Sequence, residues 1–349
     1  MTPLNDGDAP APLTPPDDAA NFGVSQVSGS AQQQAIAPSP FVADPAAPAP
    51  PVYADAPPPG SSASIDQPLF ANYAQPPVRR PVRIPHFGHL LLLSLLIVGV
   101  FCIVVIALGL ASYFHLFGLR FSAISATDVG FNLAFEAVLY FGTFGLALWV
   151  FPMIWNEGYF AGLQWRGDVA RSKFWLLLSI AAFCFGLAIL DQVVLPGPAN
   201  APIDKMISSP GAAWLMFAFG VTVAPFFEEM LFRGFLLPAL CTAFDWIGEK
   251  IRHASPLPLD ADGHPQWSMP AMVVGSLVTS LPFALLHREQ QGNSLGPFLL
   301  LIVISTILCA VRLKTRSLAA STLVHASYNF LLFMVELAVT GGFRHFDKM

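Results

Sequence analysis

Two adjacent glutamates lie in the middle of an otherwise apolar stretch of the chain, residues 218–233. An ionisable side chain is expensive inside a lipid bilayer and by default marks a functional site. Glu229 and Arg233 are four residues apart, so on a helix they share a face and can form an ion pair. Glu228 points about 100° away from Glu229 around such a helix. The pattern therefore predicts one carboxylate that an arginine neutralises and one that remains free for chemistry.

Further polar side chains occur in two later apolar segments. His287 ends the apolar run of residues 281–287, and His325 and Asn329 lie four apart within residues 323–330. Four-residue spacing places His325 and Asn329 on one helical face. A lone helical histidine is usually a packing residue, but buried polar groups need partners. We therefore expect the two histidines, the asparagine and the glutamates to converge on one buried cavity.

Such a cavity could hydrolyse an acyl bond. A glutamate beside a histidine can hold and deprotonate water, which is a general-base arrangement. A neighbouring histidine and asparagine could donate hydrogen bonds to the oxyanion that forms when water adds to a carbonyl group. Peptide-bond hydrolysis fits these residue types, and proton-coupled transport fits them less specifically.

The composition is that of a membrane protein. The 349-residue chain has a mean hydropathy of +0.59, with 54% hydrophobic and 11% charged residues, whereas a soluble chain carries about 25% charged residues. The four cysteines are far apart, with no paired spacing, so a disulfide framework or a zinc–thiolate site is not expected. Nothing in the chain indicates a nucleic-acid partner.

The N-terminal segment has a different composition. The first 78 residues hold 17 of the 32 prolines, seven aspartates and no Lys or Arg. Such a segment cannot bury enough apolar surface to offset the entropy of ordering it. We therefore predict a disordered Pro/Ala-rich tail at residues 1–80, followed by a membrane domain at residues 86–341.

Seven runs of about 20 apolar residues could each cross a bilayer as a helix. They lie at residues 89–113, 130–154, 174–195, 211–240, 269–287, 295–313 and 317–340. Residues 235–251 could instead form an interfacial amphipathic helix or hide an eighth span. The fold class is therefore an all-α polytopic membrane protein, a bundle of about seven to eight transmembrane helices around a buried polar cavity.

Most of the 17 Lys and Arg residues lie in the loops on one side of these spans. The positive-inside rule then predicts a cytoplasmic N-terminus and, with seven spans, an external C-terminus, in a cell inner (plasma) membrane. This topology places Glu228 and His325 toward the cytoplasmic half. It places His287 at the external end of its span, so we expect either that this span begins near residue 278 or that Pro282 bends it.

Three motifs occur in order on successive spans: EExxxR at residues 228–233, FxxxH at residues 283–287 and HxxxN at residues 325–329. Together they resemble the CAAX-protease and bacteriocin-processing family (CPBP or Abi) of intramembrane proteases. The resemblance covers residues 86–340, and the motifs lie within about 210–330. It implies catalytic roles for Glu228 and His287 in water activation and for His325 and Asn329 in oxyanion stabilisation, with Glu229 and Arg233 as supporting residues.

The resemblance also implies a membrane-associated peptide or protein substrate and a lipid bilayer around the domain. It leaves the cofactor open, since the family is described both as glutamate-based with no cofactor and as metal-dependent. Glu228, His287 and His325 could ligate zinc with a water, but the chain contains no HExxH. A non-proteolytic scaffold or immunity protein of the same family is the main alternative, and a proton-coupled transporter would require internal repeats that the sequence does not show.

Overall fold

The computed structural model describes residues 84–116, 128–197, 202, 209–260 and 264–344. The predicted tail, residues 1–80, lies outside these residues. Within them the chain is helical and contains no strand, only one isolated bridge between Leu259 and Pro265. The predicted all-α class is therefore confirmed.

Seven helices in the described part are long and apolar enough to cross a membrane. They are α1 (Phe87–Tyr113), α2 (Val129–Trp155), α5 (Phe174–Val194), the long helix formed by α7 to α9 (Pro210–Arg252), α10 (Met269–Arg288), α11 (Leu295–Thr315) and α12 (Leu318–Val339). Two short helices, α3 (Tyr159–Gly162) and α4 (Gly167–Ser172), connect α2 to α5. The sequence predicted six of the seven spans to within two residues at each end.

Large apolar side chains cover the outer faces of these helices. Leu95, Ile103 and Trp149 are each at least 60% exposed, although contact with water would be unfavourable for them. A lipid environment removes that cost. Seven apolar helices with lipid-facing surfaces make this an integral membrane protein.

The fourth span is a single helix of 43 residues. At about 1.5 Å per residue it is roughly 65 Å long, about twice the thickness of a bilayer core. It consists of α7 (Pro210–Ala218), a π-helical turn η3 (Phe219–Val223), α8 (Ala224–Glu229), a second π-helical turn η4 (Met230–Leu236) and α9 (Leu237–Arg252). Residues 235–251 are therefore neither an eighth span nor a separate interfacial helix, but a continuation of the fourth span.

Prolines account for the two wide turns in the long helix. Pro225 and Pro238 are each the second residue of an α-helical segment that directly follows a π-helical turn. A proline within a helix has no N–H to donate, and its ring collides with the carbonyl four residues earlier. The wider turn before each proline relieves that collision, as π-bulges commonly do near functional sites. The two glutamates thus lie in a short α-helical segment between two wide turns.

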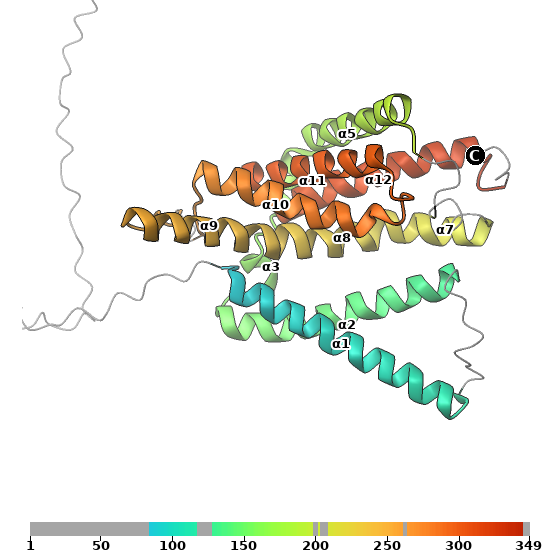
Figure 1. The fold of residues 1–349 in the computed structure, drawn as a ribbon, viewed down its shortest axis with the longest axis horizontal. Helices are drawn as coiled ribbons and strands as arrows, with labels where there is room; N and C mark the ends of the chain where they lie inside the picture. Colours follow the sequence, from blue (N-terminus) through green and yellow to red (C-terminus); the bar gives the residue numbers. More distant parts are fainter. Residues whose placement is uncertain (1–83, 117–127, 198–201, 203–208, 261–263, 345–349) are drawn as a thin grey trace, which may run out of the picture. The chain divides into compact units, whose positions relative to one another are not determined.

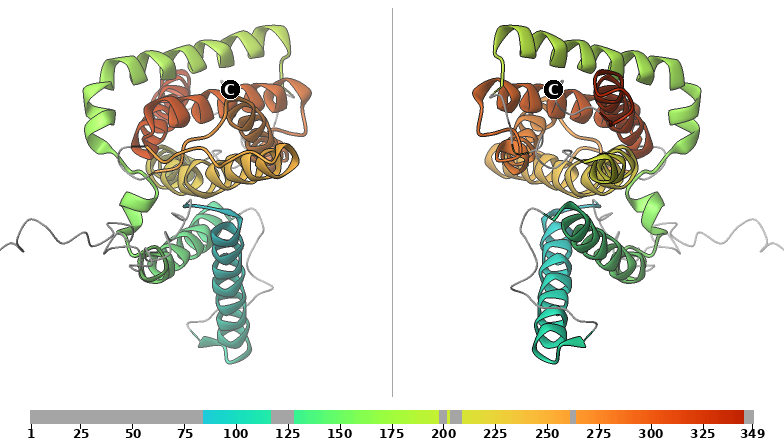
Figure 2. Two further views of the ribbon diagram at one scale, coloured as in Figure 1. Left: turned by 90° about the vertical axis from the view of Figure 1, so that its left-hand side faces the viewer. Right: turned by 90° about the vertical axis from the view of Figure 1, so that its right-hand side faces the viewer.

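The long helix lies between two groups of helices. Figures 1 and 2 show α10, α11 and α12 on one side of it and α1 and α2 on the other, with α5 packed on the outer side of α11 and α12. The apolar core on the α5 side contains Leu177, Cys184, Leu308 and Val324. The core on the α1–α2 side is mainly aromatic. The aromatic core includes Phe227, Met230 and Phe235 and so borders the middle of the long helix, where the glutamates lie.

The packing of α10 explains how His287 reaches the glutamates. At the start of α10 the backbone N–H of Ser268 donates to Asp245 Oδ2 at 2.9 Å, and further along α10 Gly275 packs against Cys241. Helix α10 therefore runs antiparallel to α9, and its last turn arrives beside α8. The expectation that this span begins near residue 278 is wrong, because α10 begins at Met269. The sequence did not predict that α9 continues so far. Because α10 begins beside the far part of α9, its other end lies level with Glu228 on α8.

Candidate active site

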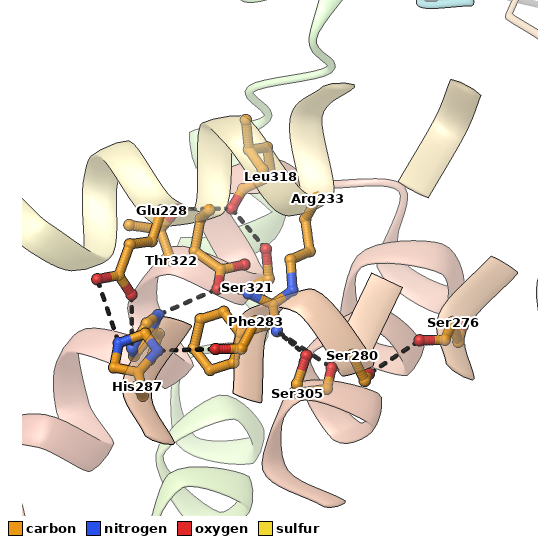
Figure 3. Close-up of polar contacts among 12 residues, drawn as sticks. Glu228, Arg233, Ser276, Ser280, Phe283, His287, Ser305, Leu318, Ser321 and Thr322 are labelled. Atoms are coloured by element: carbon orange, nitrogen blue, oxygen red, sulfur yellow. Dashed lines mark hydrogen bonds and ion pairs between the residues drawn. The ribbon is translucent and has the colours of Figure 1, made fainter. Parts of the chain in front are cut away.

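The two glutamates differ in their surroundings, as the sequence predicted. Glu229 and Arg233 are both fully buried, and Arg233 Nη1 donates to Glu229 Oε1 at 2.8 Å. Arg233 Nη2 donates to Ser305 Oγ at 2.7 Å and to the Ser305 carbonyl oxygen at 3.2 Å on α11. The guanidinium also lies 4.6 Å from the centre of the Phe283 ring on α10, within cation–π range. Figure 3 shows Arg233 reaching across to Ser305.

Glu228 lies between two imidazoles from different helices. Its Oε1 is 3.6 Å from Nε2 of His287 on α10, and its Oε2 is 3.7 Å from Nε2 of His325 on α12. The Glu228 side chain is 16% exposed, whereas that of Glu229 is fully buried. Figure 3 shows the Glu228 carboxylate pointing at the His287 ring. The structure therefore brings together three of the four predicted catalytic residues.

The hydrogen-bond partners of the two rings orient them. His287 Nδ1 is 2.8 Å from the Phe283 carbonyl oxygen, which can only accept, so Nδ1 carries a proton and donates to it. His325 Nδ1 is 3.1 Å from Glu229 Oε1, and a carboxylate oxygen also only accepts, so this Nδ1 donates as well. Both rings are thus held through Nδ1, and both direct Nε2 toward Glu228.

Glu228 and His287 are separated by slightly more than a direct hydrogen bond. Glu228 Oε1 lies 3.6 Å from His287 Nε2, which is beyond the usual N···O distance of a hydrogen bond. A water molecule beside the pair would hydrogen-bond to both groups. The arrangement thus places a carboxylate and an imidazole where both can contact one water.

Asn329 lies one helical turn beyond His325, but its hydrogen bond is to the backbone of the long helix and not to Glu228 or His287. Its Nδ2 donates to the carbonyl oxygen of Gly220 in η3 at 2.8 Å. The amide group has a second N–H, which this bond leaves available for a substrate oxygen. The structure thus ties Asn329 to the long helix two turns before Glu228, and no described contact joins it to Glu228.

The zinc alternative gains no support from the side-chain geometry. In the part of the chain that the structure describes, no group of three or more His, Cys, Asp or Glu side chains is arranged to hold a metal ion. This includes the set Glu228, His287 and His325 that the sequence offered. The chemistry below is therefore derived from the protein side chains and water.

Comparison with known families gives a match for this part of the chain. Residues 210–331, from α7 into α12, match the family described as Type II CAAX prenyl endopeptidase Rce1-like. The family resemblance is confirmed. The matched Rce1-like segment contains all six site residues that the sequence singled out. No curated protein and no solved structure matched the chain. The chain is thus a CAAX-protease-like membrane protein.

Sequence reasoning missed several residues that contact this cluster of side chains. Ser305 holds Arg233, Phe283 covers its guanidinium, and Gly220 accepts from Asn329. Serines and threonines on the facing sides of α10 and α11 were the available signal. Ser280 Oγ and Thr306 Oγ1, for example, are 3.1 Å apart between these helices. Their helical spacing indicates a row of polar side chains between α10 and α11. Only the structure shows that Arg233 hydrogen-bonds to a member of this row, Ser305.

An apolar hollow lies beside the segment of the long helix that carries Glu228. It has a volume of about 250 Å³ and lies between α1 and α2 on one side and the long helix on the other. Its lining includes Phe227 and Leu286, the sequence neighbours of Glu228 and His287, together with Tyr140 and Ala147 of α2. The hollow therefore offers room for an apolar group near the segments that carry Glu228 and His287.

Proposed function

We propose that this protein is an intramembrane endopeptidase that hydrolyses a peptide bond of a membrane-associated peptide or protein. One observation carries the proposal: the partly exposed Glu228 carboxylate lies 3.6 Å from Nε2 of His287 and 3.7 Å from Nε2 of His325, so that a carboxylate and two imidazoles can contact a single water. The match of residues 210–331 to Rce1-like prenyl endopeptidases supports the same reaction class.

The reaction follows from the roles of the side chains. Glu228 accepts a proton from water while His287 accepts the second hydrogen bond and fixes its orientation, and the resulting hydroxide adds to the carbonyl carbon. His325, held through Nδ1 by Glu229, directs Nε2 toward the site, where an N–H at this position would donate to the oxyanion. The second N–H of Asn329 is placed on the same helical face as His325 and supplies a further donor. Removal of one such donor typically slows turnover by about 10²–10³-fold.

The surroundings favour a substrate that is itself in the membrane. The apolar hollow of about 250 Å³ adjoins the cluster and would receive an apolar side chain or a lipid group of the substrate. We further propose a cytoplasmic N-terminus in a cell inner membrane, from the distribution of Lys and Arg among the loops. In this proposal residues 1–80 form a tail that the catalytic domain, residues 86–341, does not require.

The test is cleavage by purified protein in lipid nanodiscs. A library of internally quenched peptides, each with and without a C-terminal prenyl group, is the probe. The Glu228→Gln variant should lose turnover while its thermal unfolding stays at the wild-type temperature. The Glu229→Gln variant is the comparison: it should lose stability and only part of its turnover, because it breaks the buried pair with Arg233 and weakens the bond to His325.

Zinc dependence is tested in the same assay. Chelators and added zinc should both leave turnover unchanged, because the proposed steps use only side chains and water. Full activity of Glu228→Gln would overturn the assignment of the base. An absence of cleavage across the whole library, with wild-type and Glu228→Gln protein binding the same peptides, would favour a non-proteolytic scaffold.

A further inference from the structure

A second cavity lies between the first turns of α10 and the last turns of α11. Its volume is about 540 Å³, and its lining includes Met272 of α10, Ala310 and Leu313 of α11, and Trp267 from the loop before α10. Among the described residues that line it, none is one of the six site residues. The cavity therefore takes no part in the proposed reaction.

One wall of this cavity is an apolar stripe on α10. Met269 is 68% exposed, Val273 52% and Leu277 53%, and all three line the cavity. They follow one another at four-residue intervals, so they lie on one face of the helix. An apolar chain that lay along this stripe would cover side chains that are otherwise exposed, and it would continue into the cavity.

The end of the cavity beside the last turn of α11 carries positive charge. Lys314, in that turn, and Arg316, just beyond it, both line the cavity, and Lys314 is exposed. Arg316 is paired with Asp260, so Lys314 is the cation that offers its charge to a ligand. Trp267, whose Nε1 donates to Thr242 at 3.1 Å, lines the cavity beside the start of α10. Basic and indole side chains at the ends of membrane helices are typical of the bilayer interface.

A buried amide is the third feature of the cavity. Gln164, in the turn between α3 and α4, is 6% exposed and lines the cavity. Its Oε1 is buried and accepts no hydrogen bond from the described residues. A buried acceptor without a donor costs free energy, so a ligand that brought a hydroxyl group to this oxygen would remove that cost.

We propose that this cavity binds one anionic phospholipid of the surrounding membrane, with a hydroxyl group on its headgroup, as in phosphatidylglycerol. The phosphate contacts the Lys314 ammonium, a headgroup hydroxyl donates to Gln164 Oε1, and an acyl chain lies along the apolar stripe of α10. Basic pockets between membrane helices recognise anionic headgroups in this way. A free phosphate ion would use Lys314 alone, whereas the lipid uses all three features.

The test is lipid binding by the full-length protein, measured by native mass spectrometry as defined lipids are added to it in detergent. Phosphatidylglycerol should bind more tightly than phosphatidylcholine, which has no net charge. Lys314→Gln should weaken phosphatidylglycerol binding about fivefold, as expected for the loss of one basic contact to an anionic lipid. Lys250→Gln is the matched control, because Lys250 is an exposed cation near the end of α9 and outside the cavity lining. It should leave binding unchanged.

A second comparison tests the hydroxyl contact. Phosphatidylmethanol has the charge of phosphatidylglycerol but no headgroup hydroxyl, so the wild-type protein should bind it more weakly. Gln164→Met keeps the side-chain length but removes the acceptor, and it should bind the two lipids equally. If Gln164→Met does not fold, the wild-type comparison of the two lipids tests the same contact.

Three results would overturn the proposal. Equal binding of phosphatidylglycerol and phosphatidylcholine, or equal losses for Lys314→Gln and Lys250→Gln, would mean that the cavity does not select the anionic headgroup. Equal binding of phosphatidylmethanol by the wild-type protein would remove the contact with Gln164. Displacement of the lipid by glycerol 3-phosphate would show that the cavity takes a soluble phosphate. None of these measurements involves peptide cleavage, so their outcome is independent of the proposed function.

Discussion

Replacing Arg233 with methionine should destabilise the protein strongly, because it leaves the Glu229 carboxylate buried without its counter-charge. Methionine keeps most of the length and apolar volume of the arginine stem. The change removes the 2.8 Å bond to Glu229 and both bonds to Ser305. Every one of these contacts is fully buried at Arg233, so water cannot replace them.

The magnitude follows from that burial. Breaking a buried ion pair by removal of one partner costs about 3–5 kcal/mol, since the remaining charge is left without compensation. The lost bonds to Ser305 are part of the same network, so their cost is not added separately. At about 1.4 kcal/mol per tenfold, the folding equilibrium constant falls by two to four orders of magnitude. This is a large fraction of an ordinary stability of about 5–15 kcal/mol.

The assay is SDS-induced unfolding in mixed micelles, followed by the near-ultraviolet signal of the tryptophans. Arg233→Met, Glu229→Gln and the double variant form one double-mutant cycle. The double variant should be less destabilised than the sum of the two single variants, with a coupling of about 0.5–3 kcal/mol. Arg252→Met is the matched control at an exposed position of α9, and it should stay within about 0.5 kcal/mol of wild type.

Additivity in this cycle would refute the reasoning, because it would mean that the two charges do not stabilise each other. A shift of less than about 1 kcal/mol for Arg233→Met would refute it equally, since surface substitutions produce shifts of that size.

The remaining predictions concern the tail, the hollow and the convergence of the two histidines. A chain that begins at Val78 should insert and retain cleavage, because the tail composition cannot build a core; normal insertion with lost cleavage would contradict this. Ala147→Phe should fill the hollow and raise KM with little change in kcat, and an unchanged KM would show that substrate does not enter it. In a variant without native cysteines, cysteines in place of His287 and His325 should be cross-linked by a short bifunctional reagent and protected by a bound peptide inhibitor. Absence of a cross-link at every reagent length would contradict the shared site.

The spans and the ion pair could be predicted from sequence because each depends on local spacing. Apolar runs of about 20 residues identify membrane helices whatever their neighbours are. Glu229 and Arg233, four residues apart, form the expected pair even though η4 begins between them. The pairing depends only on the two side chains lying on the same face of the helix. The placement of the site residues in three different helices could also be predicted, since each motif lies within its own apolar run.

The length of the fourth helix and the depth of His287 could not be predicted. The polar and charged residues of α9 follow an apolar run, and such a sequence is typical of a membrane-surface helix or of a loop at the end of a span. In the structure this segment continues as helix and packs against α10, where Asp245 bonds to Ser268. The hydrogen-bond partner of Asn329 could not be predicted either, because it is a backbone carbonyl in the π-helical turn η3. The sequence indicates that turn only through the proline that follows it.

The adjacency of the two glutamates explains how one short segment combines rigidity with reactivity. The 100° turn between neighbours on a helix directs Glu229 into the protein, where Arg233 and His325 hold it, and directs Glu228 toward the open side. Because Glu229 also bonds to His325, the fully buried pair orients the imidazole that faces Glu228. A change at Glu229 should therefore alter oxyanion stabilisation as well as stability. A Glu229→Gln protein stabilised by lipid should fold yet turn over more slowly, and normal turnover in that folded protein would show that His325 needs no carboxylate to act.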